Sequence, residues 1–200
     1  MATVVADMSM SLDGFIAGPE DRIDEIFAWM GSGDVEVPLP VKTVMPAFRT
    51  DEASAAELRS TLDTLGAVVT GRRTFDLAGG WSGAHPMGAP AWIVTHNPPD
   101  GWEDTQVNFV TEGVESAIEQ AREAAGDGLV GVAGASIVRQ GLNAGVLDAV
   151  RVSVAPVLLG EGIRFFDGLE NPPIALRPPR VVEGEQVTHL YYEVDARARR

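Results

Sequence analysis

The stretch GLVGVAGASIVRQGL, residues 128–142, passes from an apolar, β-rich run into a helical pattern through Gly134, Ala135 and Ser136. A helix begins with backbone N–H groups that lack partners and with partial positive charge, so small residues there let a phosphate approach the main chain. Alternatively, the small residues only let the helix pack tightly against a sheet, with Ser136 as its cap. The sequence therefore predicts either a phosphate site or a close helix contact at this junction.

A second strand-to-helix junction, AVVTGRRTF, places Gly71, Arg72, Arg73 and Thr74 directly after a predicted strand at 67–70. Each cation at a helix N-terminus costs roughly 0.3 to 1 kcal/mol against the helix dipole, so two in succession indicate a bound anion. Solvated arginines that point away from the helix end are the alternative. In a chain with a net charge of -14, this local gathering of positive charge is informative.

A third junction, AWIVTHNPPDG, places Thr95 and His96 at the end of a predicted strand. In an open α/β sheet, ligands bind beyond the carboxyl ends of the parallel strands, so we expect both residues beside the first two junctions. His96 is a candidate to stack on an adenosine or to form a hydrogen bond with it. The alternative is an incidental loop histidine.

The segment SMSLDGFIAG follows the N-terminal strand and contains Asp13, either as part of an Asp-Gly turn or as a carboxylate that holds a substrate. Ile16 and Ala17, just beyond it, are candidates for a floor under a flat ring. The glycine-rich segment 79–90 surrounds Trp81 and His85 and predicts either a mobile flap or a surface loop pinned by the tryptophan. The residues that we expect around the substrate are Asp13, Trp29 and Trp81.

Short, β-rich segments alternate with helical patterns through the middle of the chain, which indicates parallel strands joined by helices. The predicted strands are 3–8, 67–70, 91–95, 106–110, 129–133 and 149–159, with a final alternating pair near 174–194. Residues 114–125 predict an amphipathic helix that stops at Gly126. We expect a single α/β domain over residues 1–200: a mixed, mostly parallel sheet flanked by helices on both faces, with antiparallel C-terminal edge strands. Residues 31–50 predict a loop and a short helix.

Composition excludes several classes of function. The acidic charge disfavours nucleic acid and anionic membranes as partners, and the absence of cysteine excludes disulfides, thiolate metal sites and a cysteine nucleophile. The histidines at 85, 96 and 189 lack metal-ligand spacing, so we expect no metal. The N-terminus lacks the regions of a signal peptide, and no apolar run approaches the ~20 residues that span a bilayer, so a cytoplasmic protein is expected.

Five segments in this order carry a family resemblance: MSLDGFIAG, GRRTF, VTH, VAGASIVRQGL and AGVLDAVRVSVAPVLLGEGIRFF. They resemble the dihydrofolate reductase-like superfamily, in particular stand-alone proteins similar to the reductase domain of the bifunctional riboflavin biosynthesis deaminase-reductase. The similarity covers nearly the whole chain apart from residues 31–50. It implies a homodimer that holds NADPH extended across the strand ends.

The resemblance also implies roles for individual residues. Arg72 would meet the 2′-phosphate of NADPH, the start of the helix at Gly134 would cradle the pyrophosphate, and Ile16 and Ala17 would lie near the nicotinamide. The full set of implied cofactor contacts is Ile16, Ala17, Gly71, Arg72, Arg73, Thr74, Thr95, His96, Gly134, Ala135, Ser136 and Ile137. One departure is that the family's paired glycines become Ala133-Gly134.

No catalytic acid can be carried over. Asp24 and Glu25 lie in the region where dihydrofolate reductases carry their substrate-protonating carboxylate, yet neither has a persuasive context. The expected activity is an NADPH-dependent reductase that transfers hydride to a small flat heterocyclic or carbonyl substrate, and the pyrimidine reductase step of riboflavin biosynthesis is the closest named reaction. The alternative is a non-catalytic, dimeric nucleotide-binding or sensor protein that retains the fold.

Overall fold

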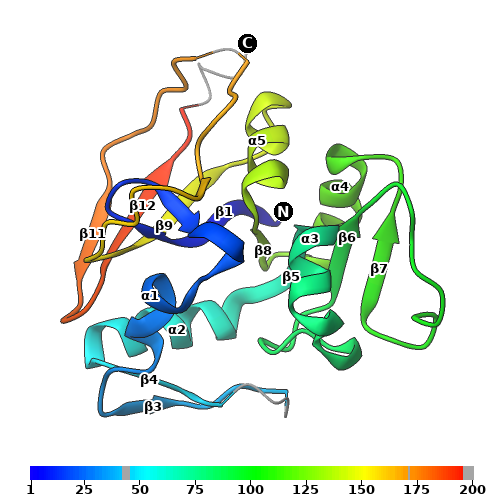
Figure 1. The fold of residues 1–200 in the computed structure, drawn as a ribbon. Helices are drawn as coiled ribbons and strands as arrows, with labels where there is room; N and C mark the ends of the chain where they lie inside the picture. Colours follow the sequence, from blue (N-terminus) through cyan, green and yellow to red (C-terminus); the bar gives the residue numbers. More distant parts are fainter. Residues whose placement is uncertain (42–45, 171, 196–200) are drawn as a thin grey trace.

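An eight-stranded mixed sheet runs through the centre of the molecule in the computed structural model, which describes residues 1–41, 46–170 and 172–195 (Figure 1). Its strand order is β11-β12-β9-β1-β8-β5-β6-β7. The bounds are β11 Arg180–Glu183, β12 Thr188–Glu193, β9 Ala149–Ala155, β1 Thr3–Ser11, β8 Leu129–Val132, β5 Leu65–Gly71, β6 Ala91–Val94 and β7 Val107–Val110. The strands from β9 to β7 pair in parallel, whereas β12 and β11 pair antiparallel at one edge.

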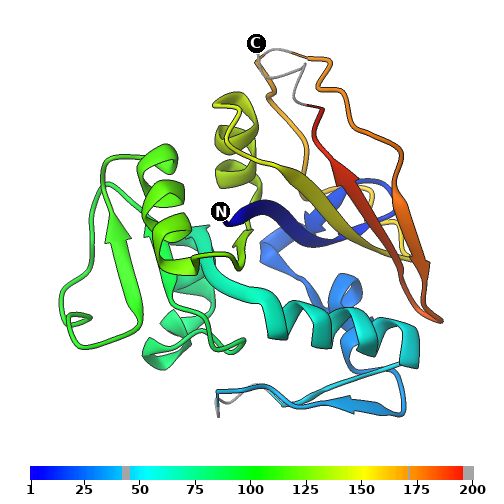
Figure 2. The ribbon, with the colours of Figure 1, turned by 180° about the vertical axis from the view of Figure 1, so that it is seen from behind.

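Within the described ranges, five α-helices cover the sheet: α1 Asp24–Phe27, α2 Glu52–Thr64, α3 Arg72–Leu77, α4 Val114–Ala125 and α5 Ala135–Asn143. Helices α4 and α5 bury their apolar stripes against one face, which carries Val4, Val130 and Val152. Helix α2 lies toward the other face, and Figure 2 shows it leading directly into β5. Gly126 follows α4 with a positive φ, so the predicted helix 114–125 and its stop are confirmed.

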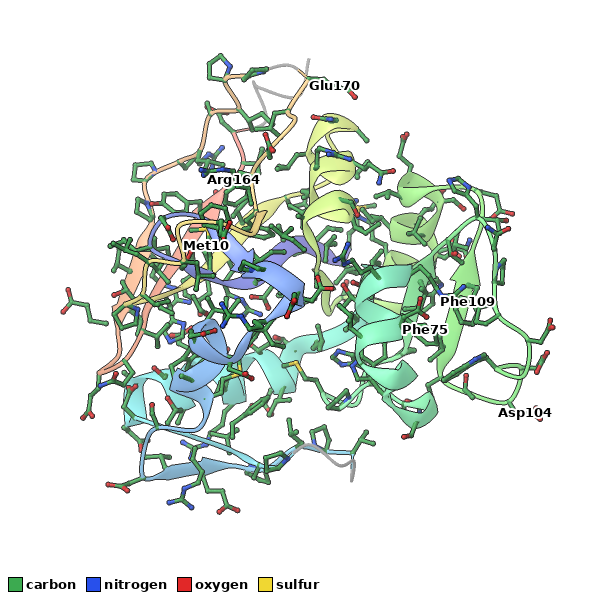
Figure 3. The ribbon with its side chains drawn as sticks, in the orientation of Figure 1. Met10, Phe75, Asp104, Phe109, Arg164 and Glu170 are labelled. Atoms are coloured by element: carbon green, nitrogen blue, oxygen red, sulfur yellow. The ribbon has the colours of Figure 1, made fainter. Side chains whose placement is uncertain are left out.

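A second apolar cluster lies under α3, where aromatic rings meet edge to face. Phe75 of α3 contacts Phe109 of β7 with ring centroids 5.3 Å apart, and Figure 3 shows the two labelled side chains together. Trp102 also stands against Phe75 at 4.8 Å. This cluster anchors α3 over β5, β6 and β7, so the beginning of α3 has a defined place at the edge of the sheet.

The expectation for residues 31–50 is wrong within the part that the structure describes. Instead of a loop and a short helix, β3 (Val35–Val37) and β4 (Phe48–Thr50) form an antiparallel pair. Val37 is 1% exposed and packs with Leu58 of α2, so burial of an alternating valine pattern outweighed the proline signals. Residues 42–45 of this segment lie outside the described residues.

The predicted mixed α/β fold is confirmed, with smaller differences at strand ends. Strand β9 stops at Ala155 rather than at residue 159 because Pro156 has no N–H to donate to the ladder. Short strands β2 (Phe15–Ala17) and β10 (Ile163–Arg164) form a separate antiparallel pair beyond the end of β1. Three short 3-10 helices complete the order: η1 Pro19–Asp21, η2 Ala28–Met30 and η3 Gly79–Gly83. In the described part of the chain, no helix has the length and apolar character needed to cross a membrane.

Candidate functional site

The three junctions expected to bind one ligand meet at a single edge of the sheet. Strands β8, β5 and β6 are parallel neighbours, so their carboxyl ends adjoin. The Thr70 hydroxyl donates a hydrogen bond of 3.0 Å to the carbonyl oxygen of Ala133, which ties the first two junctions together. A Cβ built on Gly71 would lie 3.2 Å from Cγ1 of Ile137, so β5 and α5 are in close contact.

Helix α5 begins with bare backbone. Its N-cap is Gly134, at φ +87°, and no side chain caps the helix. Ser136 is the second helical residue and is exposed, so the alternative that Ser136 serves as the cap is wrong. Because L-residues avoid this φ, glycine is needed at 134, and the first amide groups of α5 remain available to an anion. A Cβ at Gly134 would lie 3.3 Å from the Thr74 hydroxyl, which places α3 beside this helix start.

Both arginines of the second junction already have carboxylate partners within the chain. Arg72 donates from Nε to Asp76, 2.7 Å away on the same helix, and from Nη1 to the carbonyl oxygen of Asn97 at 2.6 Å. Arg73 pairs with Asp21 at 2.7 Å and 2.8 Å, and this hydrogen-bonded carboxylate raises the pKa of the guanidinium. Each guanidinium therefore has its charge balanced by a carboxylate of the chain itself. The two arginines alone therefore do not require an external anion.

The third junction lies next to Arg72. Strand β6 ends at Val94, and the hydroxyl of Thr95 accepts a hydrogen bond from the Asn97 amide at 3.2 Å to form the turn that presents the Asn97 carbonyl to Arg72. His96 is exposed in this turn. The structure therefore brings Thr95 and His96 to the same edge as Gly71 and Gly134.

Ile16 and Ala17 occupy β2, beyond the end of β1, and are 5% and 6% exposed. The Ile16 side chain packs into the main core with α4 and α5. The chain then continues into η1, where Asp21 reaches Arg73, so this segment crosses toward the start of α3.

Asp13 supports a turn. It accepts a hydrogen bond of 2.6 Å from the Ser11 hydroxyl and two more from the backbone amides of Leu159 and Gly160, at 3.1 Å and 2.7 Å. The Ser11 hydroxyl, followed by these amides, lowers the pKa of the Asp13 carboxyl to about 2. These partners lie at the end of β1 and in the loop after β9, and Asp13 is not among the described residues that line the cavity discussed next.

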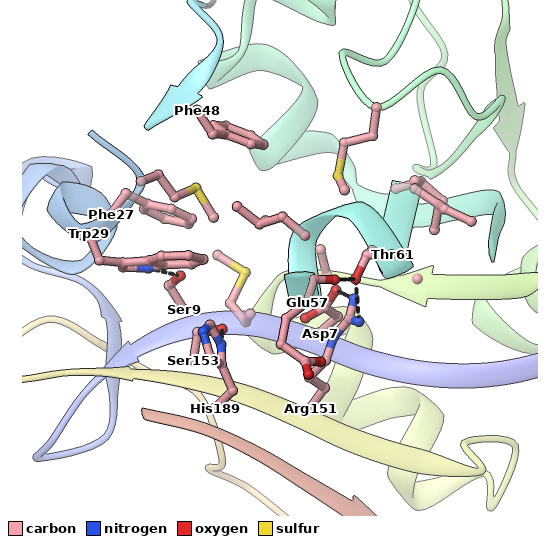
Figure 4. A pocket seen from close by; sticks show the side chains of 18 of the residues that line it. Asp7, Ser9, Phe27, Trp29, Phe48, Glu57, Thr61, Arg151, Ser153 and His189 are labelled. Atoms are coloured by element: carbon pink, nitrogen blue, oxygen red, sulfur yellow. Dashed lines mark hydrogen bonds and ion pairs between the residues drawn. The ribbon is translucent and has the colours of Figure 1, made fainter. Parts of the chain in front are cut away.

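A cavity of 220 Å³ lies between the second face of the sheet and helix α2 (Figure 4). Its apolar wall includes Phe27, Trp29, Met30, Phe48, Leu58 and Met87. Its polar floor comes from strand positions that point away from α4 and α5. The register pairs Asp7 with Arg151 and Arg151 with Tyr191, and in the next row it pairs Ser9 with Ser153 and Ser153 with His189.

The first row of the floor is a network of charges. Arg151, 8% exposed, pairs with Asp7 and donates a hydrogen bond of 2.6 Å to Thr61 of α2. Nearby, Glu57 binds Arg180 through both carboxylate oxygens, at 2.7 Å and 2.9 Å, and also accepts from the Tyr191 hydroxyl. Hydrogen bonding from Arg180 is the main cause that lowers the pKa of Glu57 to about 2, so this carboxylate is ionised at neutral pH.

The second row is neutral. The indole N–H of Trp29 donates to the Ser9 hydroxyl at 3.1 Å, and the indole meets the His189 ring edge to face with centroids 5.2 Å apart. His189 is 2% exposed and contacts Ser153 through Nδ1 at 2.9 Å. Trp29, one of the expected substrate residues, therefore lines the cavity and is held by the sheet beneath it.

Trp81 does not line the cavity. Its ring stands 6.0 Å from Phe75 and 4.8 Å from His85. His85 does line the cavity, and burial lowers its pKa to about 4, so its imidazole is neutral at pH 7. The segment around Trp81 is thus packed against the α3 cluster, with His85 as its contribution to the cavity wall.

Sequence reasoning missed the charged residues of the cavity. Asp24 and Glu25 are exposed and do not line it, whereas Asp7 and Glu57 do. One signal was available: Asp7 and Arg151 each interrupt a run of valines and small residues in a predicted strand, which is costly unless the charges are paired. Among the described residues, no group of three or more histidine or carboxylate side chains is arranged to hold a metal ion.

The arrangement defines a class of fold. The structure is similar to that of dihydrofolate reductase from Enterococcus faecalis complexed with NADP(H) and RAB-propyl, with a TM-score of 0.56 over 96% of each chain at 16% identity. The chain belongs to the RibD C-terminal domain family, whose model matches residues 2–190. The chain thus has a dihydrofolate reductase-like fold and belongs, over nearly its whole given length, to the RibD C-terminal domain family.

Individual relatives agree with this placement. A protein of Shewanella sp. PV-4 named for riboflavin biosynthesis matches 98% of this chain and 99% of its own, with a TM-score of 0.66 and 22% identity. Acinetobacter baumannii RibD has a TM-score of 0.64 at 16% identity, covering 97% of this chain but 58% of RibD. The uncharacterized Bacillus subtilis protein YwjB is 25% identical over 92% of this chain and 94% of its own.

Proposed function

We propose that this protein is an NADPH-dependent reductase that transfers hydride to a small flat heterocyclic or carbonyl substrate. The observation that carries the proposal is that the cavity adjoins the strand edge where α5 begins. Ala133 lines the cavity, and the next residue, Gly134, begins the bare N-terminus of α5. A dinucleotide laid along the strand ends could therefore reach the cavity with its reactive ring while its phosphates lie at α5.

The residues at the strand edge fit such a cofactor. Gly134 exposes the amides of the α5 N-terminus to a pyrophosphate, and the Thr74 hydroxyl lies beside it. Arg72 uses Nε and Nη1 for its hydrogen bonds to Asp76 and Asn97, and among the described residues its Nη2 has no hydrogen-bond partner. We propose that Nη2 binds the 2′-phosphate. The cofactor-contact proposal retains Ile16, Ala17, Gly71, Arg73, Thr95, His96, Ala135, Ser136 and Ile137 from the resemblance.

The chain contributes binding and electrostatics. NADPH, when bound, supplies the hydride. Trp29 and Phe27 offer flat apolar walls that exclude water from a planar ring, and the charged row holds Asp7 and Glu57 in place. Glu57 is ionised and accepts from Arg180 and Tyr191, so it does not act as a proton donor at neutral pH. We propose Trp29 as the substrate contact retained from the expected set, with Asp13 and Trp81 acting through the surrounding loops.

Within this class, the pyrimidine reductase step of riboflavin biosynthesis makes a specific demand, because the phosphate of its substrate needs a cation. The described lining contains one cationic side chain, Arg151, and it is already paired with Asp7 and Thr61. Arg180, beside the cavity, is paired with Glu57. This charge distribution favours an unphosphorylated substrate; Lys42 lies outside the described residues. Assaying 5-amino-6-(ribosylamino)uracil with and without its 5′-phosphate distinguishes a phosphorylated from an unphosphorylated substrate.

The first experiment is a fluorescence titration with NADPH and with NADH, on the wild type and on Arg72→Ala and Arg73→Ala. We expect a preference for NADPH that Arg72→Ala removes, because only NADPH carries the 2′-phosphate. Arg59→Ala is the matched control, since Arg59 is an exposed arginine on α2 whose carboxylate partner is Glu52. A folded protein that binds neither nucleotide would refute the proposal.

A non-catalytic, nucleotide-binding sensor is the second candidate. It is supported by the lining of the cavity, where we identify no proton donor for a substrate among the described residues. It predicts NADPH binding without oxidation across a panel of pterins, pyrimidines and quinones. We also propose a homodimer, as the family resemblance implies, and a cytoplasmic location. The net charge of -14 supports the proposal that nucleic acid is not a partner. Light scattering coupled to gel filtration would test the dimer.

A further inference from the structure

A chain of hydrogen bonds leads from the cavity floor to the surface. Ser153 contacts Nδ1 of His189 at 2.9 Å, Nε2 of His189 contacts Ser54 at 3.1 Å, and the Ser54 hydroxyl donates to Asp51 at 2.8 Å. Ser153, His189 and Ser54 are 8%, 2% and 0% exposed. Only Ser153 and His189 line the cavity, and Figure 4 shows them side by side beneath Trp29.

The surface end of the chain sets its direction. Asp51 is the N-cap of α2 and accepts hydrogen bonds from the amides of Ser54 at 3.0 Å and Glu185 at 3.2 Å. Burial raises the pKa of the Asp51 carboxyl, but the hydrogen bonds from Ser54 and Glu185 outweigh it and leave the pKa below its usual value. An ionised carboxylate only accepts, so the Ser54 hydroxyl donates to it and turns a lone pair to His189.

The same reasoning fixes the proton position on His189. Because the Ser54 hydroxyl donates its hydrogen to Asp51, Nε2 of His189 carries the proton and donates to the Ser54 oxygen. Burial is the largest influence and lowers the pKa of His189, although the carboxylates of Glu57, Asp51 and Asp7 oppose it and Arg151 adds to it. A neutral imidazole has one N–H, so Nδ1 is an acceptor. The Ser153 hydroxyl therefore donates to Nδ1, and its oxygen presents only lone pairs to the cavity.

We infer that Ser153 is a specificity-determining residue that accepts a hydrogen bond from an exocyclic amino group of the substrate, with His189, Ser54 and Asp51 as positioning residues that keep the Ser153 oxygen an acceptor toward the cavity. The inference rests on the proposed function, because it takes the cavity as the substrate site. A site whose polar group can only accept rejects an isosteric ligand that places a carbonyl there, since two lone pairs would face each other.

The β11–β12 hairpin, which carries His189, packs closely against the hydrogen bond between Ser54 and Asp51. A Cβ built on Gly184, at the turn between β11 and β12, would lie 2.3 Å from the Ser54 hydroxyl oxygen and 2.8 Å from Oδ2 of Asp51. The turn therefore closes directly over the Ser54–Asp51 hydrogen bond, and a side chain at 184 would push it apart.

The test uses pterin and lumazine, two bicyclic rings of nearly equal shape. Lumazine carries a carbonyl, an acceptor, in place of the exocyclic amino group of pterin, a donor, and its adjacent ring nitrogen carries a hydrogen that pterin lacks. Binding of each to the full chain is measured by calorimetry, with and without saturating NADP⁺. We expect the wild type to prefer pterin by about tenfold or more. Ser153→Ala should reduce this preference to near unity, and Ser153→Thr should restore it by keeping the hydroxyl.

Ser54→Ala provides the decisive variant because Ser54 does not line the cavity. Without Ser54, either nitrogen of His189 can carry the proton, so Ser153 can donate or accept and the preference should fall several-fold. Thr64→Ala is the control, because it removes an α2 hydroxyl whose hydrogen-bond partners among the described residues are the helix carbonyls of Ser60 and Thr61. A merely structural role for Ser54 would lower stability and leave the ratio of the two affinities unchanged.

Equal affinity of the wild type for the two rings, no binding of either, or a preference that survives Ser153→Ala would each overturn the inference. The wild-type comparison needs no variant, so a variant that fails to fold leaves it decisive. NADPH binding is titrated separately. If the protein binds NADPH but does not prefer pterin to lumazine, the inference about Ser153 fails while the proposed reductase function stands. If the protein does not bind NADPH, the proposed function fails.

Discussion

Removing the guanidinium of Arg151 should destabilise the protein strongly. Arg151 is 8% exposed, pairs with Asp7 and donates to Thr61 at 2.6 Å. Breaking a buried pair by deleting one partner costs about 3 to 5 kcal/mol because the other charge is left uncompensated. Since the Asp7 side chain is 30% exposed, we expect the lower end, about 3 kcal/mol, for Arg151→Met. At roughly 2 to 4 °C per kcal/mol for a chain of this size, Tm should fall by about 6 to 12 °C.

The assay is thermal unfolding at neutral pH of Arg151→Met, Asp7→Leu and the double variant. The double variant should recover most of the loss, because replacing both charges with apolar side chains of similar size is often nearly neutral. Arg59→Met, which removes an exposed pair with Glu52, should cost no more than about 0.5 kcal/mol. A drop for Arg151→Met no larger than that of Arg59→Met, or additive losses in the double variant, would refute the reasoning.

Three further predictions concern pH, the cofactor edge and the cavity wall. The pKa of Glu57 is about 2 in the folded state and lies below its unfolded value, so the stability it contributes is present above that unfolded value and lost as pH falls toward 2. Glu57→Gln should lower stability at pH 7 and flatten the acid side of the unfolding curve; an unchanged acid side would contradict this. Gly134→Val should weaken NADPH binding at least tenfold, with Gly126→Val, a positive-φ glycine beyond α4, as the control for backbone strain alone in titrations of both variants. Trp29→Phe keeps the apolar wall but loses the hydrogen bond to Ser9, so calorimetry should show ligand affinity falling several-fold, and Trp29→Ala should fall further; equal affinities in the two variants would count against this role.

The sequence alone predicted the elements whose signals are local. The apolar periodicity of residues 114–125, the Gly126 stop and the strand-to-helix order at Gly71 and Gly134 depend on neighbours within a few residues, and all appear in the structure. Where the local sequence pattern and long-range packing favoured different structures, packing determined the structure that formed. The prolines of residues 31–50 indicated a loop, yet burial of Val37 against α2 favoured a strand pair.

Only the tertiary structure decided the cavity and the partners of the charges. Asp7 and Arg151 are separated by 144 positions and meet because β1 and β9 pair in one particular register. Arg73 likewise pairs with Asp21, 52 positions away in the sequence, because the tertiary fold brings the two together. An argument from the helix dipole considers only neighbouring residues and does not predict this pair. The sequence determined which strands and helices form and which strand ends carry small residues, because those depend on local propensity and periodicity. The register between strands distant in sequence, which only global packing sets, decided which polar side chains share the cavity floor.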